Sequence, residues 1–182
     1  MSAPGVAVHT PLFARLIGAA FTTLPNTVQH LHRCPGRSLY HGDVTVERGA
    51  GWLSRGCAWA TRLPPAGHGP IEVEIVAASA MERWTRHVGR HAMHSRLWAG
   101  DGLLCERLGL VTFGFRLGVE HGSLTWRVVR VRALGLPLPA SMFSRVLARE
   151  GETDGRYTFD VRAELPVIGL LVHYRGWLHV ES

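Results

Sequence analysis

The stretch from residue 81 to residue 95, MERWTRHVGRHAMHS, decides how the fold is interpreted, because it holds His87, His91 and His94 at intervals of four and three. On a helix, this spacing would present three metal ligands on one face. The sequence Val88-Gly89-Arg90-His91, however, puts glycine at the first central position of a two-residue loop, as a type II′ hairpin turn requires. The stretch is therefore predicted to be a β-hairpin.

The predicted hairpin keeps the three histidines apart. Val88 would lie opposite His91, while His87 and His94 would point to the other face of the sheet, since successive side chains of a strand alternate between faces. A site of three converging histidines is therefore not expected, and a surface site of two histidines is the remaining metal alternative. We expect neither a bound metal nor a cofactor.

The face of the hairpin that carries Arg86 holds the main candidate site. Trp84 would lie opposite Ser95, and a loop at residues 99–102, AGDG, would place Glu106 of the next strand beside Ser95. Burying Arg86 or Glu106 alone would cost several kcal/mol, so the two charges must be paired or solvated. Two interpretations stay open: a bridge that satisfies both charges, or a pair that contacts a ligand.

Aromatic side chains extend this face beyond Glu106. A bulge at Gly109 would absorb one residue, and a turn at His121-Gly122 would then set Phe113 opposite Arg130 on the face that also carries Trp126. Arg130 would either extend to solvent or reach an anionic group of a ligand.

The remaining elements predict an α+β fold that is mainly β. Thr10-Pro11 begins a helix with Phe13, Leu16, Ile17, Ala20 and Phe21 on one stripe. A second helix is expected over residues 51–63 and a short one over 142–149, with further strands at 71–77, 124–134, 156–165 and 168–180. We expect a curved antiparallel sheet or β-barrel, calycin-like or helix-grip-like, closed by the N-terminal helices.

Length and composition limit the class of protein. The 182 residues, 46% hydrophobic, fit one domain, with a helical segment at 1–36 packed on an antiparallel β body at 37–182. All 20 basic residues are Arg, and they are spread along the chain, so the formal charge of +6 does not indicate nucleic-acid binding. Three distant cysteines and the absence of an export signal or a membrane-spanning segment predict a cytoplasmic protein.

Several short motifs occur in an order that resembles a known family. They include Glu82-Arg83-Trp84-x-Arg86, Ser95, Glu106-Arg107-x-Gly109, Gly135-Leu136-Pro137-Leu138-Pro139, Pro166-x-x-Gly169 and Tyr174-Arg175-Gly176-Trp177-Leu178. Together they resemble the bacterial family named domain of unknown function 4166, over nearly the whole chain. In that family, the domain often follows a saccharopine-dehydrogenase-like or other NAD-binding domain. The resemblance implies no assigned activity, but it adds Tyr174 to the candidate site and an NAD-dependent oxidoreductase to the possible partners.

Three kinds of function follow from these observations. The first is binding of an apolar or amphipathic small molecule by Trp84, Arg86, Ser95, Glu106, Phe113, Trp126, Arg130 and Tyr174. The second is cofactor-independent acid–base catalysis in the same pocket, with Glu106 as the catalytic candidate. The third is a docking module for a partner oxidoreductase, and an enclosed cavity would favour the first two over it.

Overall fold

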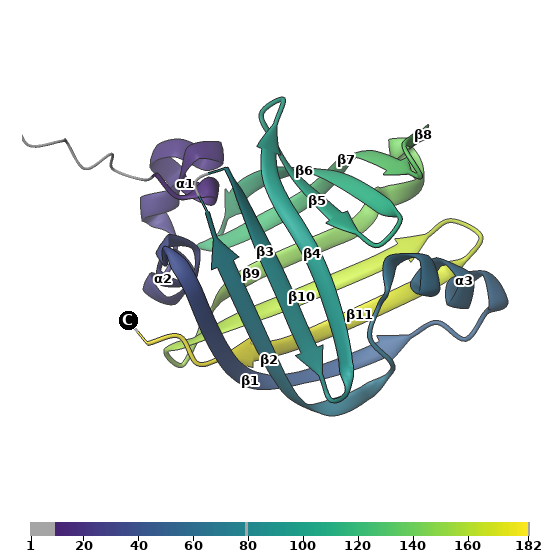
Figure 1. The fold of residues 1–182 in the computed structure, drawn as a ribbon, viewed down its shortest axis with the longest axis horizontal. Helices are drawn as coiled ribbons and strands as arrows, with labels where there is room; N and C mark the ends of the chain where they lie inside the picture. Colours follow the sequence, from purple (N-terminus) through teal and green to yellow (C-terminus); the bar gives the residue numbers. More distant parts are fainter. Residues whose placement is uncertain (1–9, 79, 182) are drawn as a thin grey trace, which may run out of the picture.

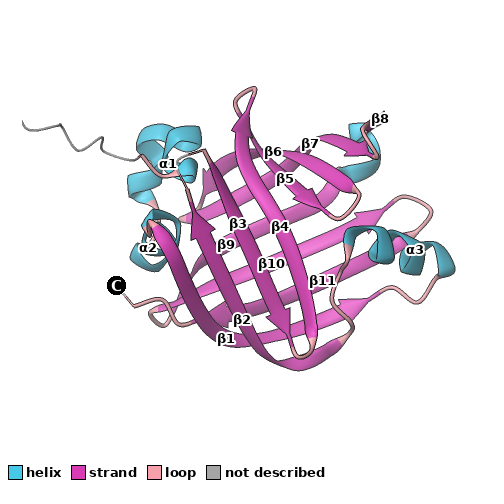
Figure 2. Cartoon of the chain, in the orientation of Figure 1, coloured by secondary structure: helices cyan, strands magenta, loops and turns pink. Residues whose placement is uncertain are grey.

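The fold is an antiparallel β-barrel with a few short helices (Figures 1 and 2). The computed structural model describes residues 10–78 and 80–181. The helical elements are α1 (Leu12–Ile17), η1 (Gly18–Thr23), α2 (Asn26–Arg33), α3 (Trp52–Thr61) and η2 (Ala140–Phe143). The strands are β1 (Gly36–Arg48), β2 (Gly67–Ala77), β3 (Met81–Val88), β4 (His91–Gly100), β5 (Leu103–Leu108), β6 (Val111–Glu120), β7 (Ser123–Ala133), β8 (Leu136–Leu138), β9 (Arg145–Thr153), β10 (Arg156–Leu165) and β11 (Gly169–Leu178).

The sheet closes on itself through its end strands. Its strands follow the order β6-β5-β4-β3-β2-β1-β11-β10-β9-β7-β8, and β6 also pairs with β7. The ten strands other than β8 therefore form a closed barrel, which removes unpaired sheet edges. Strand β7 forks: its first half pairs with β9 and its second half with β8. The expectation of a mainly β, antiparallel fold is confirmed, and of its two forms the barrel is the one present.

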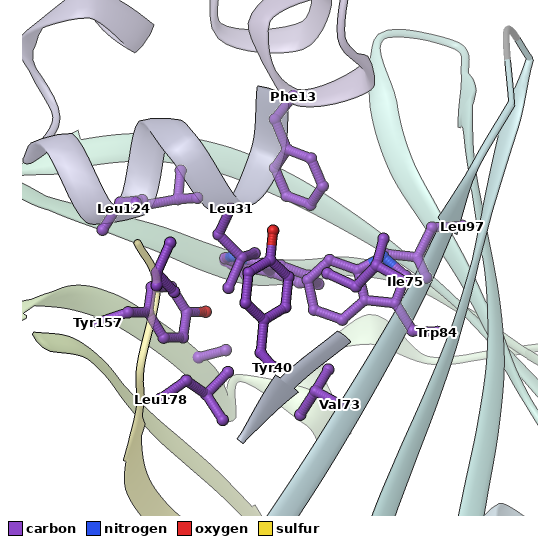
Figure 3. Packing of buried hydrophobic residues seen from close by; sticks show 14 of the residues in the cluster. Phe13, Leu31, Tyr40, Val73, Ile75, Trp84, Leu97, Leu124, Tyr157 and Leu178 are labelled. Atoms are coloured by element: carbon purple, nitrogen blue, oxygen red, sulfur yellow. The ribbon is translucent and has the colours of Figure 1, made fainter. Parts of the chain in front are cut away.

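The helices cover the two ends of the barrel. One end is covered by α1, η1 and α2, the helical elements that come before β1 in the chain. From them, Phe13 and Leu31 point into the core beside Trp84 (Figure 3). Helix α2 is tied to β9 because Glu152 accepts hydrogen bonds from the backbone N–H and the hydroxyl of Thr27, at 3.1 and 2.8 Å. At the other end, α3 lies against the β5–β6 turn, where the N–H of Leu110 donates to the carbonyl of Ala60.

Two predicted helices differ from the structure. The first predicted helix is broken at Gly18, whose φ of 59° ends α1, so Phe21 lies on the 3₁₀ helix η1 and Ala20 is exposed. The second is wrong: residues 145–149, the larger part of the helix expected at 142–149, belong to strand β9, which lies between β7 and β10. Pairing on both sides outweighs the weak helical pattern of this segment. Helix α2 was not predicted, whereas the helix expected at 51–63 is confirmed as α3.

The β3–β4 hairpin has the predicted register, but the β4–β5 pairing does not. Val88 pairs with His91 and Trp84 with Ser95, and Gly89 has a φ of 57°. In β4–β5, the turn consists of Asp101 and Gly102 alone, both at positive φ, instead of the four-residue loop expected. Because a type I′ turn needs only two residues, the register shifts by two, and Glu106 pairs with Leu97 instead of Ser95.

The predicted bulge at Gly109 is also wrong. Gly109 and Leu110 form the β5–β6 turn, so Leu108 pairs with Val111. The irregularity lies further along, between Gly114 and Phe115, where β7 carries one extra residue. This bulge lies at the fork of β7, where pairing with β9 ends and pairing with β8 begins.

Candidate functional site

The interior of the barrel holds an apolar cavity of about 370 Å³. It reaches from Leu31 of α2, at the end covered by α1, η1 and α2, to Thr61 of α3 and Phe143 of η2 at the opposite end, which we call the mouth. Most of its lining side chains are apolar. The charged side chains among its lining residues are Arg86, Glu106 and Glu150.

Arg86 and Glu106 meet inside the barrel, as the hairpin predicted. Both side chains are buried, and both terminal nitrogens of Arg86 lie 3.5 Å from Oε1 of Glu106. Arg86 Nη1 also donates to the hydroxyl of Ser95 at 3.1 Å, and its guanidinium carbon lies 4.9 Å from the ring centre of Trp84. At 3.5 Å the Arg86–Glu106 contact is at the long limit of a hydrogen bond, so a polar group of a ligand can compete for either partner.

The pKa of Arg86 shows how the pair is balanced. Burial alone would lower the pKa of Arg86, but the attraction of Glu106, followed by smaller contributions from Tyr174, Tyr157 and Glu150, raises it above the usual value. The guanidinium therefore stays charged inside the barrel, held by the carboxylates around it. A permanent positive charge in an apolar cavity can fix the orientation of a bound molecule.

A second polar group faces the cavity from β9 and β10. Glu150 lies 2.6 Å from Nε2 of His32, whose side chain is fully buried, and Tyr157 hydrogen-bonds to Glu150. Burial first, and then Glu150, raise the pKa of Tyr157 well above its usual value, and burial raises the pKa of Tyr174 to about 12. The tyrosine hydroxyls are thus neutral donors over the whole physiological range of pH.

The aromatic rings connect these two polar groups. His32 stacks on Trp84 with 5.8 Å between ring centres, and Phe13 lies 3.7 Å from the ring of His32. Trp126 lines the cavity, is buried, and its indole N–H has no hydrogen-bond partner within the described residues. A buried donor without a partner is uncommon, and here it lies beside the cavity, where a ligand oxygen could accept its hydrogen.

Most of the residues expected at the site lie together, and one does not. Trp84, Arg86, Glu106, Phe113, Trp126 and Tyr174 line the cavity. Ser95 does not line it but holds Arg86. Arg130 lies outside: the bulge moves its partner from Phe113 to Gly114, and its guanidinium binds Asp101 at 2.8 Å on the outer surface. Expected opposite Phe113, Arg130 is displaced because one extra residue in β7 reverses which face it occupies.

Sequence reasoning missed three residues of the site. His32 lies on the unpredicted helix α2, and Glu150 lies on β9, where a helix was expected. A period-two signal for β9 exists, since Val146, Ala148 and Glu150 alternate with Arg145 and Arg149. Tyr157 was placed correctly on the inner face of its strand, but its contact with Glu150 could not be foreseen without β9.

The described residues form neither a cluster of metal ligands nor a membrane-spanning helix. Among the described residues, no three His, Cys, Asp or Glu side chains gather closely enough to hold a metal ion. His91 Nε2 lies 2.9 Å from the carbonyl oxygen of Arg62, whereas His94 contacts Thr85 on the outer face. Within the same residues, no helix combines the length and hydropathy needed to cross a bilayer.

A protein-family model described as "Domain of unknown function (DUF4166)" matches residues 24–178. The chain belongs to this family. The match spans every charged residue of the cavity, and it confirms the resemblance expected from the sequence motifs. In this DUF4166 chain, α1 and η1 precede the matched region, although they cover one end of its barrel.

Comparison of this DUF4166 chain with individual proteins adds little. No curated protein matches it significantly. Among solved structures, Rv2717c from M. tuberculosis is similar with a TM-score of 0.45 and 11% sequence identity, over 87% of this chain and 99% of that chain.

Proposed function

We propose that the barrel binds an apolar or amphipathic small molecule, with Arg86 and Glu106 as its polar anchors. The observation that carries this proposal is one buried charge pair facing an apolar cavity. The volume, about 370 Å³, falls within the range of roughly 300–1,000 Å³ that is usual for small-molecule sites. Such sites combine an apolar lining with a few converging polar groups, and the cavity favours this function over a docking module.

The geometry suggests how the ligand would lie. Its polar group would be placed among Arg86, Glu106 and the indole N–H of Trp126, which has no partner among the described residues. Its apolar body would extend toward the mouth, where Phe113 and Phe143 belong to a second apolar cluster. An uncharged hydroxyl or carbonyl suits this position, since Arg86 already has the Glu106 carboxylate nearby.

The alternative of acid–base catalysis uses the same site. It is supported by the second carboxylate, Glu150, which contacts His32 and Tyr157 inside the barrel. Under this alternative, a Glu106→Gln variant would retain affinity for the bound molecule and lose its conversion. Under binding alone, the same variant would change affinity and nothing would be converted in either protein.

The test is to fill the cavity. Ala148 lines it from β9, and Ala148→Phe should remove small molecules detected by native mass spectrometry of freshly purified protein. Affinity for the probe 1-anilinonaphthalene-8-sulfonate should fall at least about tenfold, because most of the buried ligand surface is lost. Ala92→Phe, on the outer face of β4, is the matched control and should change neither result.

Folding of the filled variant is checked by cooperative thermal unfolding. If Ala148→Phe does not fold, Val161→Phe on β10 fills the same cavity from the neighbouring strand. Unchanged probe affinity in a folded, cavity-filled variant would refute the proposal.

A further inference from the structure

The exposed apolar side chains gather at the mouth of the barrel. Of the eleven large hydrophobic side chains that are exposed among the described residues, nine lie at this end. We call them the rim: Trp52, Leu53, Trp59, Leu110, Leu134, Leu136, Leu138, Met142 and Val167. They come from α3 and from the three connections at residues 109–110, 134–144 and 166–168, so distant parts of the sequence converge at one end of the barrel (Figure 1). A concentration of this kind marks an interaction surface.

Helix α3 connects the rim with the cavity. Its inner face, with Cys57 and Thr61, lines the cavity, while Trp52 and Trp59 project outward and are 74% and 77% exposed. The two tryptophans are seven residues apart, two turns of helix, and so lie on one side. Leu138 and Met142 belong both to the rim and to the cavity lining. The apolar surface is therefore continuous from the outside into the barrel.

The charges in the connections between elements at this end have one sign. The connections at the mouth are residues 49–66, 89–90, 109–110, 134–144 and 166–168, which contain Arg55, Arg62 and Arg90 and no Asp or Glu. All three arginines are exposed. On α3, Arg55 lies between the two tryptophans. Turns at the opposite end, in contrast, carry Asp101 and Asp154.

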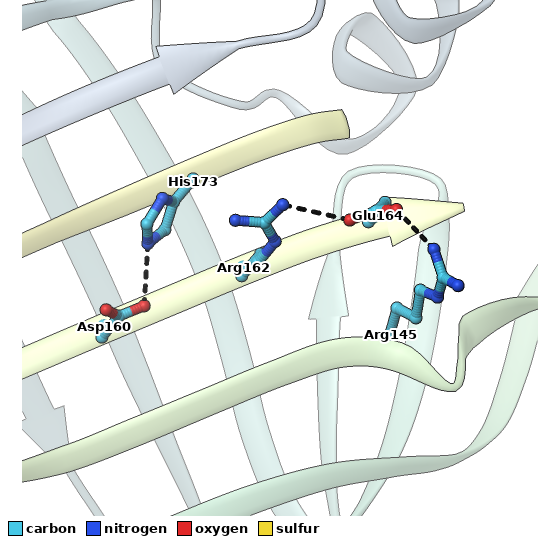
Figure 4. Close-up of polar contacts among 5 residues, drawn as sticks. All are labelled: Arg145, Asp160, Arg162, Glu164 and His173. Atoms are coloured by element: carbon cyan, nitrogen blue, oxygen red, sulfur yellow. Dashed lines mark hydrogen bonds and ion pairs between the residues drawn. The ribbon is translucent and has the colours of Figure 1, made fainter. Parts of the chain in front are cut away.

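A nearby acidic side chain is already neutralised. Glu164, at the mouth end of β10, binds Arg145 at 2.6 Å and Arg162 at 3.1 Å (Figure 4). The two guanidinium groups lower the pKa of Glu164, so this cluster keeps a net positive charge. The mouth thus presents exposed tryptophan and leucine side chains surrounded by arginine.

From this combination we propose that the mouth of the barrel docks on an anionic membrane surface. Tryptophan is enriched at the boundary between headgroups and acyl chains, and arginine is attracted to anionic headgroups. Trp52 and Trp59 enter the headgroup region, while Arg55, Arg62 and Arg90 contact lipid phosphates. The cavity then opens directly on the bilayer, from which an amphipathic molecule can enter without crossing water.

Charge selects this partner over a second copy of the chain. A symmetric contact between two rims would bring the arginines of both copies together with no carboxylate from the mouth connections between them. The membrane, in contrast, supplies the opposite charge and an apolar layer at the same surface. Docking does not depend on the proposed cavity ligand, since the two tryptophans and three arginines that it uses lie outside the cavity.

The test is co-sedimentation of the full chain with phosphatidylcholine vesicles, prepared with and without phosphatidylglycerol. The protein should bind the anionic vesicles, and the partition coefficient should be at least about tenfold lower for the neutral ones, because each basic residue adds to the attraction. Trp52→Ser with Trp59→Ser, and separately Arg55→Gln with Arg90→Gln, should each reduce binding to anionic vesicles by at least about tenfold.

Matched controls keep the result specific. Leu39→Ser changes an exposed leucine near the start of β1, at the opposite end, and Arg116→Gln changes an exposed arginine on the barrel wall. Both should bind like the unchanged protein. Equal losses in these controls, or no binding of the unchanged protein to anionic vesicles, would overturn the proposal. The proposal would also be overturned if the protein did not bind vesicles but self-associated, and if the tryptophan substitutions abolished that self-association.

The cavity-filling variant separates this inference from the proposed function. Ala148→Phe should lose the fluorescent probe but still bind anionic vesicles as the unchanged protein does. Retained vesicle binding with unaltered probe affinity would leave docking intact and refute the ligand site. Loss of vesicle binding on filling the cavity would show that the rim does not act independently and would overturn docking by the rim.

Discussion

The buried pair of Arg86 and Glu106 should be strongly coupled in folding stability. At 3.5 Å and an effective dielectric constant of about 20, the attraction of the two charges is about 5 kcal/mol before the cost of desolvation. Removing one partner of such a pair typically costs about 3–5 kcal/mol, because the other charge stays buried without compensation. Glu150 also attracts Arg86, so the lower end of this range, about 3 kcal/mol, is expected for Glu106→Leu.

The two single substitutions should differ in size. Glu106→Leu leaves a buried guanidinium, which cannot lose its proton. Arg86→Met instead leaves buried carboxylates, and a carboxylate can bind a proton and become neutral. Arg86→Met should therefore destabilise less than Glu106→Leu. The double variant, with apolar groups in both positions, should cost at most about 1 kcal/mol more than the milder single variant.

The assay is unfolding in urea, monitored by circular dichroism. The four proteins are compared if the free energy of unfolding depends on urea concentration with the same slope in each. The coupling energy is the difference between the loss of unfolding free energy in the double variant and the sum of the losses in the two single variants. It is expected to be about 2–3 kcal/mol. The exposed pair Arg145–Glu164 is the control: its contact is shorter, at 2.6 Å, but solvent screens it, and its coupling should be much smaller. Additive single substitutions of Arg86 and Glu106 would refute the reasoning.

The same four proteins separate a structural pair from a ligand-binding one. If Arg86 and Glu106 only satisfy each other, the double variant keeps the probe affinity of the unchanged protein. If they anchor a ligand, the double variant keeps much of its stability and loses affinity, as polar sites commonly trade stability for function.

Three further predictions concern the fold. Gly89→Val should lower the free energy of unfolding by roughly 1 kcal/mol or more, because Gly89 has a φ of 57°; an unchanged melting temperature would contradict the turn. Deleting the residues before Gly36 should give an aggregating or molten product, since it uncovers one end of the barrel; cooperative unfolding of a soluble truncation would show that the helices are dispensable. Burial raises the pKa of all three tyrosines, Tyr40, Tyr157 and Tyr174, so absorbance at the phenolate band should show no step near pH 10 while the protein is folded. Because these pKa values are higher in the folded state, stability should be fully present below about pH 10 and fall as the pH rises toward the folded pKa of Tyr174, about 12; a normal phenolate titration with intact circular dichroism would contradict their burial.

Elements specified by local chemistry could be predicted from the sequence. The β3–β4 hairpin follows from Gly89 and from the alternation around it, and β10 follows from the strict alternation of residues 156–165. In both, the turn residues and the period-two pattern identify the inner face without information from other strands. The inward positions of Trp84, Arg86 and Tyr157 follow from these two elements alone.

Elements specified by distant partners could not be predicted in this way. Strand β9 is stabilised by pairing with β7 and β10, and helix α2 by packing on β9 and by Glu152, which lies 125 residues from Thr27. Their sequences carry only weak patterns of their own. The contact of His32 with Glu150 joins these two segments, and for that reason the second polar group of the cavity was missed.

The size of each register error decided which site residues were placed correctly. The β4–β5 turn was predicted two residues too long, and a shift of two leaves every side chain on its original face, so Glu106 still meets Arg86. The β6–β7 pairing was predicted without a bulge, and the one extra residue in β7 reverses the face, so Arg130 lies outside beside Asp101. Two-residue turns are recognisable from Gly and Asp at their centres. This bulge, in contrast, lies where pairing of β7 with β9 ends and pairing with β8 begins, and no local pattern in β7 encodes this change of partner. Inner-face assignments that depend on turns alone are therefore secure in this barrel, and those that cross the fork of β7 are not.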